Sequence, residues 1–147
     1  MISFEEFETK TGGRLDALDI TDEVVEVARD SGVNVGNVLV FSPHTTCSVM
    51  ISSGGMETVR RLDEAMSALA PDHLYYQHDD FSIRTENMTE DEPPNAPAHI
   101  LHVFAGKASE CIPIVDGRPM LGDGQRVLFV ELDSSRKRRY CIQVVGE

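Results

Sequence analysis

The stretch Arg126-Val-Leu-Phe-Val-Glu-Leu132 decides the fold class of this 147-residue chain. Its apolar, β-branched and aromatic residues predict a strand, and the polar segment Asp133–Arg136 after it predicts a turn. Arg138–Val145 predicts the last strand. Upstream, Cys111–Val115 predicts another strand, which ends at the hairpin signal Asp116-Gly117. Such a run of strands indicates antiparallel or mixed sheets.

Single helices interrupt the strands in the rest of the chain. The expected strands there are Ser3–Thr9, Arg14–Ile20, Asn37–Phe41 and Val49–Ile51, and the expected helices are a segment capped by Thr21 and Met56–Ala70. Asn37–Phe41 is a continuous apolar run, which predicts a central strand because such runs are typical of strands buried on both faces. About eight or nine strands and about three helices predict one α+β domain over residues 1–147.

The charge balance argues against two classes of partner. The formal net charge is -12 and the isoelectric point is about 4.7, whereas nucleic acids and anionic membranes need a basic protein surface. No apolar run approaches the length of a membrane span, and the N-terminus has no signal core. Cys47, Cys111 and Cys141 are isolated from one another, so we expect reduced, buried thiols. These features predict a cytoplasmic protein without nucleic-acid or membrane partners.

Asn95-Ala-Pro-Ala-His-Ile-Leu-His102 is the first candidate for chemistry. Asn95 is a favoured N-cap, so we expect a short helix from Asn95 to Ala105 that is closed by Gly106. On this helix His99 and His102 are three residues apart and share a face. The first turn is expected to offer free N–H groups and a dipole that favour a phosphate or carboxylate. At this spacing the alternative is one solvated and one packed histidine.

A second candidate lies where an expected central strand is interrupted. Pro43 breaks the ladder, and His44, Thr45 and Thr46 follow it at a bend that a rigid scaffold would hold. The alternative is that the threonine hydroxyls only cap this bend.

A third candidate is His78, which lies in a long polar segment that reaches Pro94. Asp79 and Asp80 follow it directly, so His78 is a candidate metal ligand with carboxylate support. The alternative is a solvated loop histidine, as we expect for His73.

The dense basic cluster of this acidic chain is Arg136-Lys137-Arg138-Arg139. It is either a solvated hairpin turn that balances nearby acid or an anion clamp, for which the planar fork of arginine is suited.

The order of these motifs resembles the YjbQ-like family, which is also called the secondary thiamine-phosphate synthase family. The segments that carry the resemblance are Ser42–Thr46, His78, Asn95–His99, Ile112–Arg118, Leu121-Gly122, Gln125, Glu131–Asp133 and Arg136–Arg139. The match runs through nearly the whole chain, and its strongest parts are the tail from Ile112 to Glu147 and the Asn-x-x-Ala-His signature.

The resemblance implies an α+β fold of packed, mostly antiparallel sheets, a homotrimer with sites near subunit contacts, and a weak thiamine-phosphate synthase activity. It implies a polar cluster of His44, Thr45, Thr46, His78, Asn95, His99 and Gln125, with Asp133 and the arginines nearby. It also suggests a divalent metal held by His44, His78 and His99. Zinc is the first expectation for histidine ligands, and a phosphate substrate would bring magnesium.

Three functions are therefore compared. In a synthase, the catalytic groups would be His44, Thr45, Thr46, His99 and Gln125, and the phosphate of a small anionic metabolite would be bound by Asn95, Arg136, Arg138 and Arg139. In a metal-dependent hydrolase of a small phosphate ester, the same groups would serve a metal-bound hydroxide. In a non-catalytic trimeric protein, they would hold a metal or a metabolite without turnover.

Overall fold

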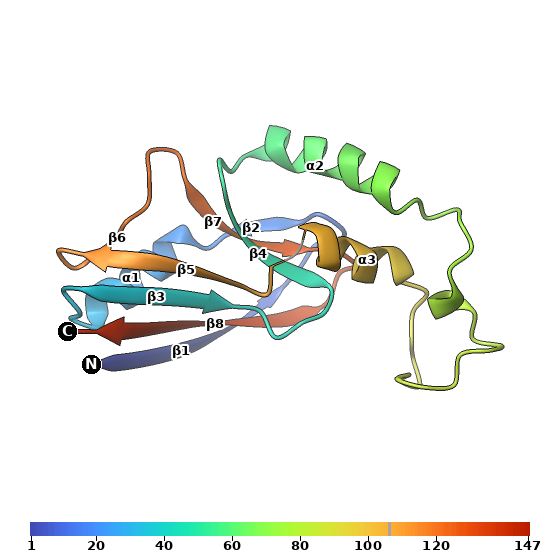
Figure 1. The fold of residues 1–147 in the computed structure, drawn as a ribbon, viewed down its shortest axis with the longest axis horizontal. Coiled ribbons are helices and arrows are strands. Elements are labelled where there is room, and N and C mark those ends of the chain that lie inside the picture. Colours follow the sequence, from blue (N-terminus) through green and yellow to red (C-terminus); the bar gives the residue numbers. More distant parts are fainter. Residues whose placement is uncertain (106) are drawn as a thin grey trace.

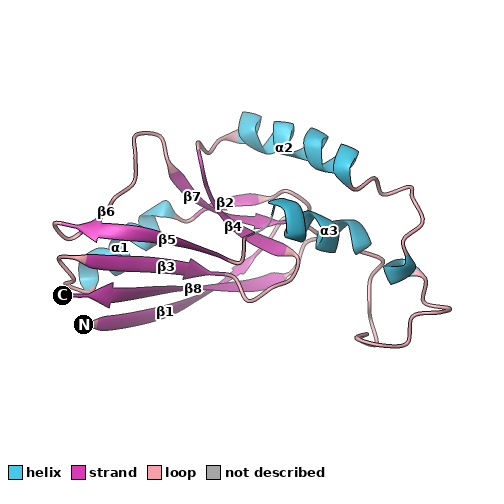
Figure 2. Ribbon diagram, viewed as in Figure 1, coloured by secondary structure: helices cyan, strands magenta, loops and turns pink. Residues whose placement is uncertain are grey.

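The structure is a computed structural model that describes residues 1–105 and 107–147, without the side chains of Met56, Glu57, Val59 and Arg60. The strands are β1 (Ile2–Lys10), β2 (Ala17–Asp19), β3 (Gly36–Phe41), β4 (Cys47–Ser52), β5 (Ser109–Val115), β6 (Arg118–Pro119), β7 (Arg126–Glu131) and β8 (Lys137–Gly146). The helices are α1 (Thr21–Asp30), α2 (Met56–Leu69), the short 3-10 helix η1 (Gln77–Asp79) and α3 (Ala96–Ala105) (Figure 2). The predicted α+β class is confirmed.

The strands form two antiparallel sheets. The larger sheet has the strand order β1-β8-β3-β5-β6, and the smaller sheet has the order β2-β7-β4. Figure 1 shows both chain ends at one end of the larger sheet, with α2 and α3 beyond the smaller sheet. The segment between α2 and α3 extends away from the sheets and carries η1.

The strand β7 is the centre of the structure because both of its faces are buried. Val127 and Phe129 point into a core shared with the larger sheet and α1. Leu128 and Val130 point the opposite way, into a second core shared with α2 and α3. Successive side chains of a strand alternate between faces, so one apolar run supplies two cores. At the end of this run Glu131 is also fully buried.

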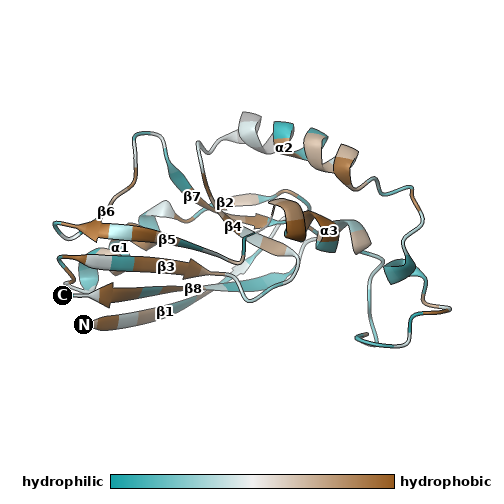
Figure 3. Ribbon diagram, viewed as in Figure 1, coloured by the Kyte–Doolittle hydropathy of each residue, from teal (hydrophilic) through white to brown (hydrophobic). Residues whose placement is uncertain are grey.

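The prediction for the strand β3 is half confirmed. β3 lies between β8 and β5, so it is central in its sheet. The expectation of two buried faces was wrong, because Val38 and Val40 are buried whereas Phe41 is 38% exposed. Within the described residues nothing covers this outer face of the larger sheet. Figure 3 shows apolar residues along β3, β5 and β8.

The prediction of three buried thiols was wrong, because two of the cysteines lie on this outer face. Cys47 is buried, but Cys111 is exposed and Cys141 is partly exposed. Cys111 belongs to the register positions of β5 that point away from the core, since its neighbour Ile112 points inward. All three cysteines are free.

The predicted cap of α1 was wrong by one residue, because the N-cap position is Ile20. Thr21 is the first residue of α1 and not its cap: its hydroxyl donates to Asp19 (2.6 Å) and accepts the backbone N–H of Val127 (2.9 Å). This hydroxyl therefore joins the helix start to β7. Gly106, the predicted end of α3, lies outside the described residues. Among the helices that are described, none is long and apolar enough to cross a membrane.

Candidate functional site

Most of the predicted site residues line one hollow of about 500 Å³ between the segment after β3, the start of α3 and the turn before β8. The predicted residues that line it are His44, Thr45, Thr46, Asn95, His99, Arg136 and Arg138. We call this space the histidine hollow. The long segment after α2 also lines it, with Arg84, Asp91 and Glu92 among its residues.

Asn95 enters the histidine hollow in a way that the capping rule does not predict. Its backbone carbonyl accepts the N–H groups of Ala98 and His99, as an N-cap carbonyl does. Its side chain, however, donates through Nδ2 to Asp133 (2.8 Å). The cap is supplied by Asp79, which accepts the backbone N–H of Ala96 (2.9 Å).

Two consequences follow because Asp79, and not the side chain of Asn95, caps α3. First, the first turn of α3 has no spare N–H for an anion: Ala96, Ala98 and His99 already donate, and Pro97 has no N–H. The anion cradle expected at the helix start is therefore occupied by the chain itself. Second, Asn95 Oδ1 is buried and has no hydrogen-bond partner in the described structure, although buried polar atoms almost always have one.

His99 is a neutral imidazole with both nitrogens available. Burial, followed by the neighbouring His78, lowers the pKa of His99 below its ordinary value of 6.5. No hydrogen bond to its ring occurs among the residues described. His102 does not share this site: its Nε2 is buried without a partner, and it does not line the histidine hollow.

His78 lies beside His99 but its own nitrogens are engaged. The two rings have centroids 4.8 Å apart. Nδ1 of His78 is 2.8 Å from Asp79, and Nε2 is 3.0 Å from Arg84. Because arginine only donates, Nε2 is the acceptor and Nδ1 carries the proton. Arg84 is fixed in turn by Glu92 (3.0 Å).

His44 is held in a defined tautomer by the backbone of β8. Its Nε2 accepts the N–H of Arg139 (3.1 Å), so the neutral ring carries its proton on Nδ1. Burial, followed by the charge of Arg138, lowers the pKa of His44 below 6.5. At neutral pH His44 is therefore an uncharged hydrogen-bond donor.

A buried ion pair forms the floor of the site. Arg138 donates to Glu131 through Nε (2.7 Å) and Nη2 (2.6 Å), with side-chain exposures of 6% and 0%. Arg138 also donates to the hydroxyl of Thr46 (3.0 Å). Burial pushes the pKa of Glu131 up, but hydrogen bonds from Arg138 and Thr11 outweigh it, so this pKa lies below its usual value.

Strand geometry divides the basic cluster Arg136–Arg139 among different surroundings. Arg136 lines the histidine hollow and donates to Asp133 (2.6 Å). Arg138 points inward to Glu131. Lys137 and Arg139 point to the outer face, because side chains alternate along β8. The arginines of this cluster therefore do not converge on one anion within this chain.

Gln125 lies far from the other predicted residues. It precedes β7, and its Oε1 accepts the N–H of Gly122 (2.8 Å) in the loop after β6. Asp133 follows the opposite end of β7, and a six-residue strand spans roughly 20 Å. Within one chain Gln125 therefore does not reach the histidine hollow.

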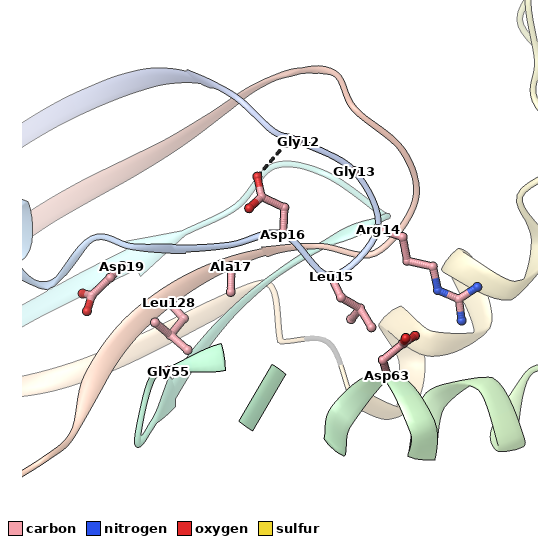
Figure 4. A pocket seen from close by; sticks show the side chains of 10 residues that line it. All are labelled: Gly12, Gly13, Arg14, Leu15, Asp16, Ala17, Asp19, Gly55, Asp63 and Leu128. Atoms are coloured by element: carbon pink, nitrogen blue, oxygen red, sulfur yellow. Dashed lines mark hydrogen bonds between the residues drawn. The ribbon is translucent and has the colours of Figure 1, made fainter. Parts of the chain in front are cut away.

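A second hollow of about 550 Å³ lies under α2 (Figure 4). Figure 4 shows Arg14 extending toward α2, from which Asp63 points back. Its remaining carboxylates have local partners: Asp16 accepts the N–H of Gly12, and Asp19 accepts from Arg126. Among the residues whose side chains the structure describes, no histidine or nucleophile lines this hollow, so it offers less chemistry than the histidine hollow.

Sequence reasoning did not single out Arg84 and Glu92, and it did not predict that Asp79 caps α3 or that Glu131 is buried. A signal existed for Glu131, because it is a lone charge within an apolar run that reaches Leu132. No local signal marks Arg84 and Glu92, which belong to a long polar segment.

Comparison with known proteins gives consistent matches over nearly the whole chain. A family model described as UPF0047 protein YjbQ-like matches residues 5–147. A UPF0047 protein of Archaeoglobus fulgidus is 33% identical over 140 residues, which cover 95% of this chain and 99% of the relative.

Solved structures agree with these matches. A hypothetical protein of Aeropyrum pernix K1 has a TM-score of 0.84 at 31% identity and is matched over 99% of both chains. A YbjQ-like protein of unknown function from Sulfolobus solfataricus P2 has a TM-score of 0.86 at 23% identity, over 100% of this chain and 99% of that one, and shows the fold alone.

Proposed function

The chain belongs to the YjbQ-like UPF0047 family, and we propose that it is an enzyme that performs acid–base chemistry on a small phosphorylated metabolite in the histidine hollow. One observation carries this proposal: the neutral, unpaired imidazole of His99 lines the same hollow as the unpartnered Oδ1 of Asn95. A lowered pKa keeps a histidine ready to accept a proton at neutral pH.

The surrounding residues have complementary roles in this proposal. Asn95 Oδ1 accepts a hydrogen bond from an N–H or O–H of the substrate. His44 donates from Nδ1, and Arg136, which is 35% exposed, faces the phosphate. Thr45 is exposed and orients the substrate, whereas Thr46 and Arg138 are positioning residues because they are bound to each other.

The specific reaction that we propose to test is thiamine-phosphate synthesis, which the sequence resemblance implies. It joins a pyrimidine pyrophosphate to a thiazole phosphate and releases pyrophosphate. Negative charge develops on the leaving pyrophosphate, and preorganised donors such as Arg136 and His44 stabilise such charge. A hydrolase of a phosphate ester is the alternative reaction at the same residues.

The test is a product analysis with purified protein. We expect product only when both phosphorylated substrates are present, and a loss of about a hundredfold to ten-thousandfold in His99→Ala, as for other general acid–base groups. His73→Ala is the matched control, because His73 is exposed and outside the hollow. Release of phosphate from one substrate alone would favour the hydrolase, and full activity of His99→Ala would contradict the proposed role of His99.

A divalent metal is the second proposal for this site. Among the described residues no group of three histidine, cysteine or acidic side chains is arranged to hold a metal. A three-histidine zinc site requires His78 to release Arg84 and His44 to release Arg139, so the present arrangement does not fit it. His99 and Asn95 Oδ1 are the available donors, and magnesium would arrive with the phosphate. Elemental mass spectrometry of wild type and His99→Ala tests this: metal lost in the variant supports it.

We propose assembly as a homotrimer through the part of the outer face of the larger sheet that lies along Cys141–Val145 of β8, at the opposite end of this strand from Lys137. Ile2, Phe4, Phe41, Val115 and Val145 are exposed on β1, β3, β5 and β8. Several large apolar side chains exposed on one face of a sheet mark a candidate protein interface. Gln125 would join the site only from another chain. Sedimentation equilibrium should give a trimer that Phe4→Asp dissociates, and a monomeric wild type would contradict the proposal.

A further inference from the structure

We propose that Lys10 and Lys137 form a second anion site, which binds a phosphate group on the outer face of the larger sheet. This site goes beyond the proposed function, since it uses neither His99 nor Asn95. It lies in a separate hollow of about 570 Å³ lined by Glu8, Thr9, Lys10, His44, Lys137, Arg138 and Arg139. We call this space the lysine hollow.

The first observation is the register of β1 and β8. Lys10 and Lys137 are directly opposite each other in this antiparallel pair. Opposite residues point to the same face and have Cβ atoms about 5 Å apart. Like charges at such positions destabilise a strand pair, so the two ammonium groups repel each other in the free protein.

The second observation is that neither ammonium is neutralised by the chain. Neither Lys10 nor Lys137 forms an ion pair in the part of the protein that the structure describes. The other lysine, Lys107, does pair with Glu110 (3.1 Å). Three lysines occur in a chain of net charge -12. Two of them thus face each other unpaired, although the chain has many acidic residues.

The third observation is the composition of the surrounding wall. Arg139 is two residues from Lys137 on the same face, and its guanidinium is 3.6 Å from Glu6. The carboxylate in the wall is that of Glu8, which lies opposite Arg139 in the register. The positive groups therefore outnumber the negative ones locally. An anion with several oxygens can accept hydrogen bonds from both lysines and remove their repulsion.

His44 connects the two hollows. It lines both of them, and its Nε2 is fixed to the backbone of Arg139 in the wall of the lysine hollow. A phosphate at Lys10 and Lys137 would therefore lie in the hollow next to His44. The compact tetrahedral charge of a phosphate suits two ammonium groups, which act as point charges without a fixed fork.

The test is isothermal titration calorimetry of inorganic phosphate into the full chain at low ionic strength. We expect saturable binding that Lys10→Gln and Lys137→Gln each weaken by about tenfold, the scale of one lost charge-assisted hydrogen bond. Lys107→Gln removes the same charge outside the site and is expected to stay within about twofold of wild type. An equal loss in Lys107→Gln would indicate general electrostatic attraction and overturn the site, as would the absence of saturable binding to wild type.

Two further measurements separate this site from the proposed enzyme. Arg136→Gln is expected to bind inorganic phosphate as wild type does, even where it lowers turnover, so a loss of phosphate binding in Arg136→Gln would place the anion in the histidine hollow. In the absence of phosphate, Lys10→Gln is expected to raise the melting temperature, because it removes the like-charge pair. A lower melting temperature would contradict the repulsion.

Discussion

The strand β7 has a carboxylate–arginine pair at each end, and the two pairs differ in burial rather than in distance. At one end Arg126 Nε is 2.7 Å from Asp19, with side-chain exposures of 40% and 41%. At the other end Arg138 Nε is 2.7 Å from Glu131, with exposures of 6% and 0%. The two pairs therefore differ in their effect on stability although their distances are equal, because water screens the exposed pair and not the buried pair.

The largest expected effect comes from breaking the buried pair. Glu131→Ala leaves the charge of Arg138 buried without a partner, and this should lower the free energy of unfolding by about 3–5 kcal/mol. Arg126→Ala at the exposed end should cost about 1 kcal/mol or less, because Asp19 keeps its hydrogen bonds from Thr21. Urea denaturation of both variants measures the difference. Similar losses in the two variants would show that burial does not distinguish the pairs.

A smaller loss of stability is expected from a buried hydrogen bond that lies at the same end of β7 as the exposed ion pair. Thr21→Val removes the hydroxyl that accepts the buried N–H of Val127 at the exposed end. An unsatisfied buried donor costs about 1–3 kcal/mol, more than the exposed ion pair beside it. Thr21→Ser keeps the hydroxyl and is the control. If Thr21→Val and Thr21→Ser are equally stable, this hydrogen bond contributes nothing.

The two ends should also respond in different pH ranges. The pKa values of His44 and His99 lie below 6.5 in the folded chain, so the unfolded chain binds more protons and stability falls as the pH drops below about 6.5. The Asp19 carboxyl accepts hydrogen bonds from Arg126 and Thr21, which outweigh the effect of burial and lower its pKa below 3.8. Its contribution is therefore present above pH 3.8 and lost only as the pH falls through its folded pKa.

Melting temperatures between pH 7 and pH 5 measure the contribution of the two histidines to stability. This range includes the ordinary histidine pKa of about 6.5. The double variant His44→Gln, His99→Gln should show a flatter dependence than wild type. An unchanged slope would mean that other groups control this range.

The smallest expected effect belongs to the exposed arginine. Arg126→Gln should change the free energy of unfolding by about 0.5 kcal/mol or less. In about 1 M salt this difference should vanish, because the screening length is then about 3 Å. The loss in Glu131→Ala should persist in the same buffer, since a buried pair is hardly screened.

The sequence by itself determined the element types and their order. Alternation and turn residues place the strands from Cys111 to Val145, because they act between neighbours in the chain. The helix that begins after Asn95 follows from the same local rules. The motif order also indicated the family, and most of its polar residues do line one hollow.

Only the tertiary structure decided which atoms of those residues remain available for chemistry. Asp79 caps α3 from a distant segment, and this leaves Asn95 Oδ1 without a partner. The backbone of Arg139 fixes the tautomer of His44, which is distant in sequence. Arg138 is bound by Glu131 and is unavailable to a ligand. Hydrogen-bond partners depend on how separate segments meet in space, and local sequence patterns carry no information about that meeting.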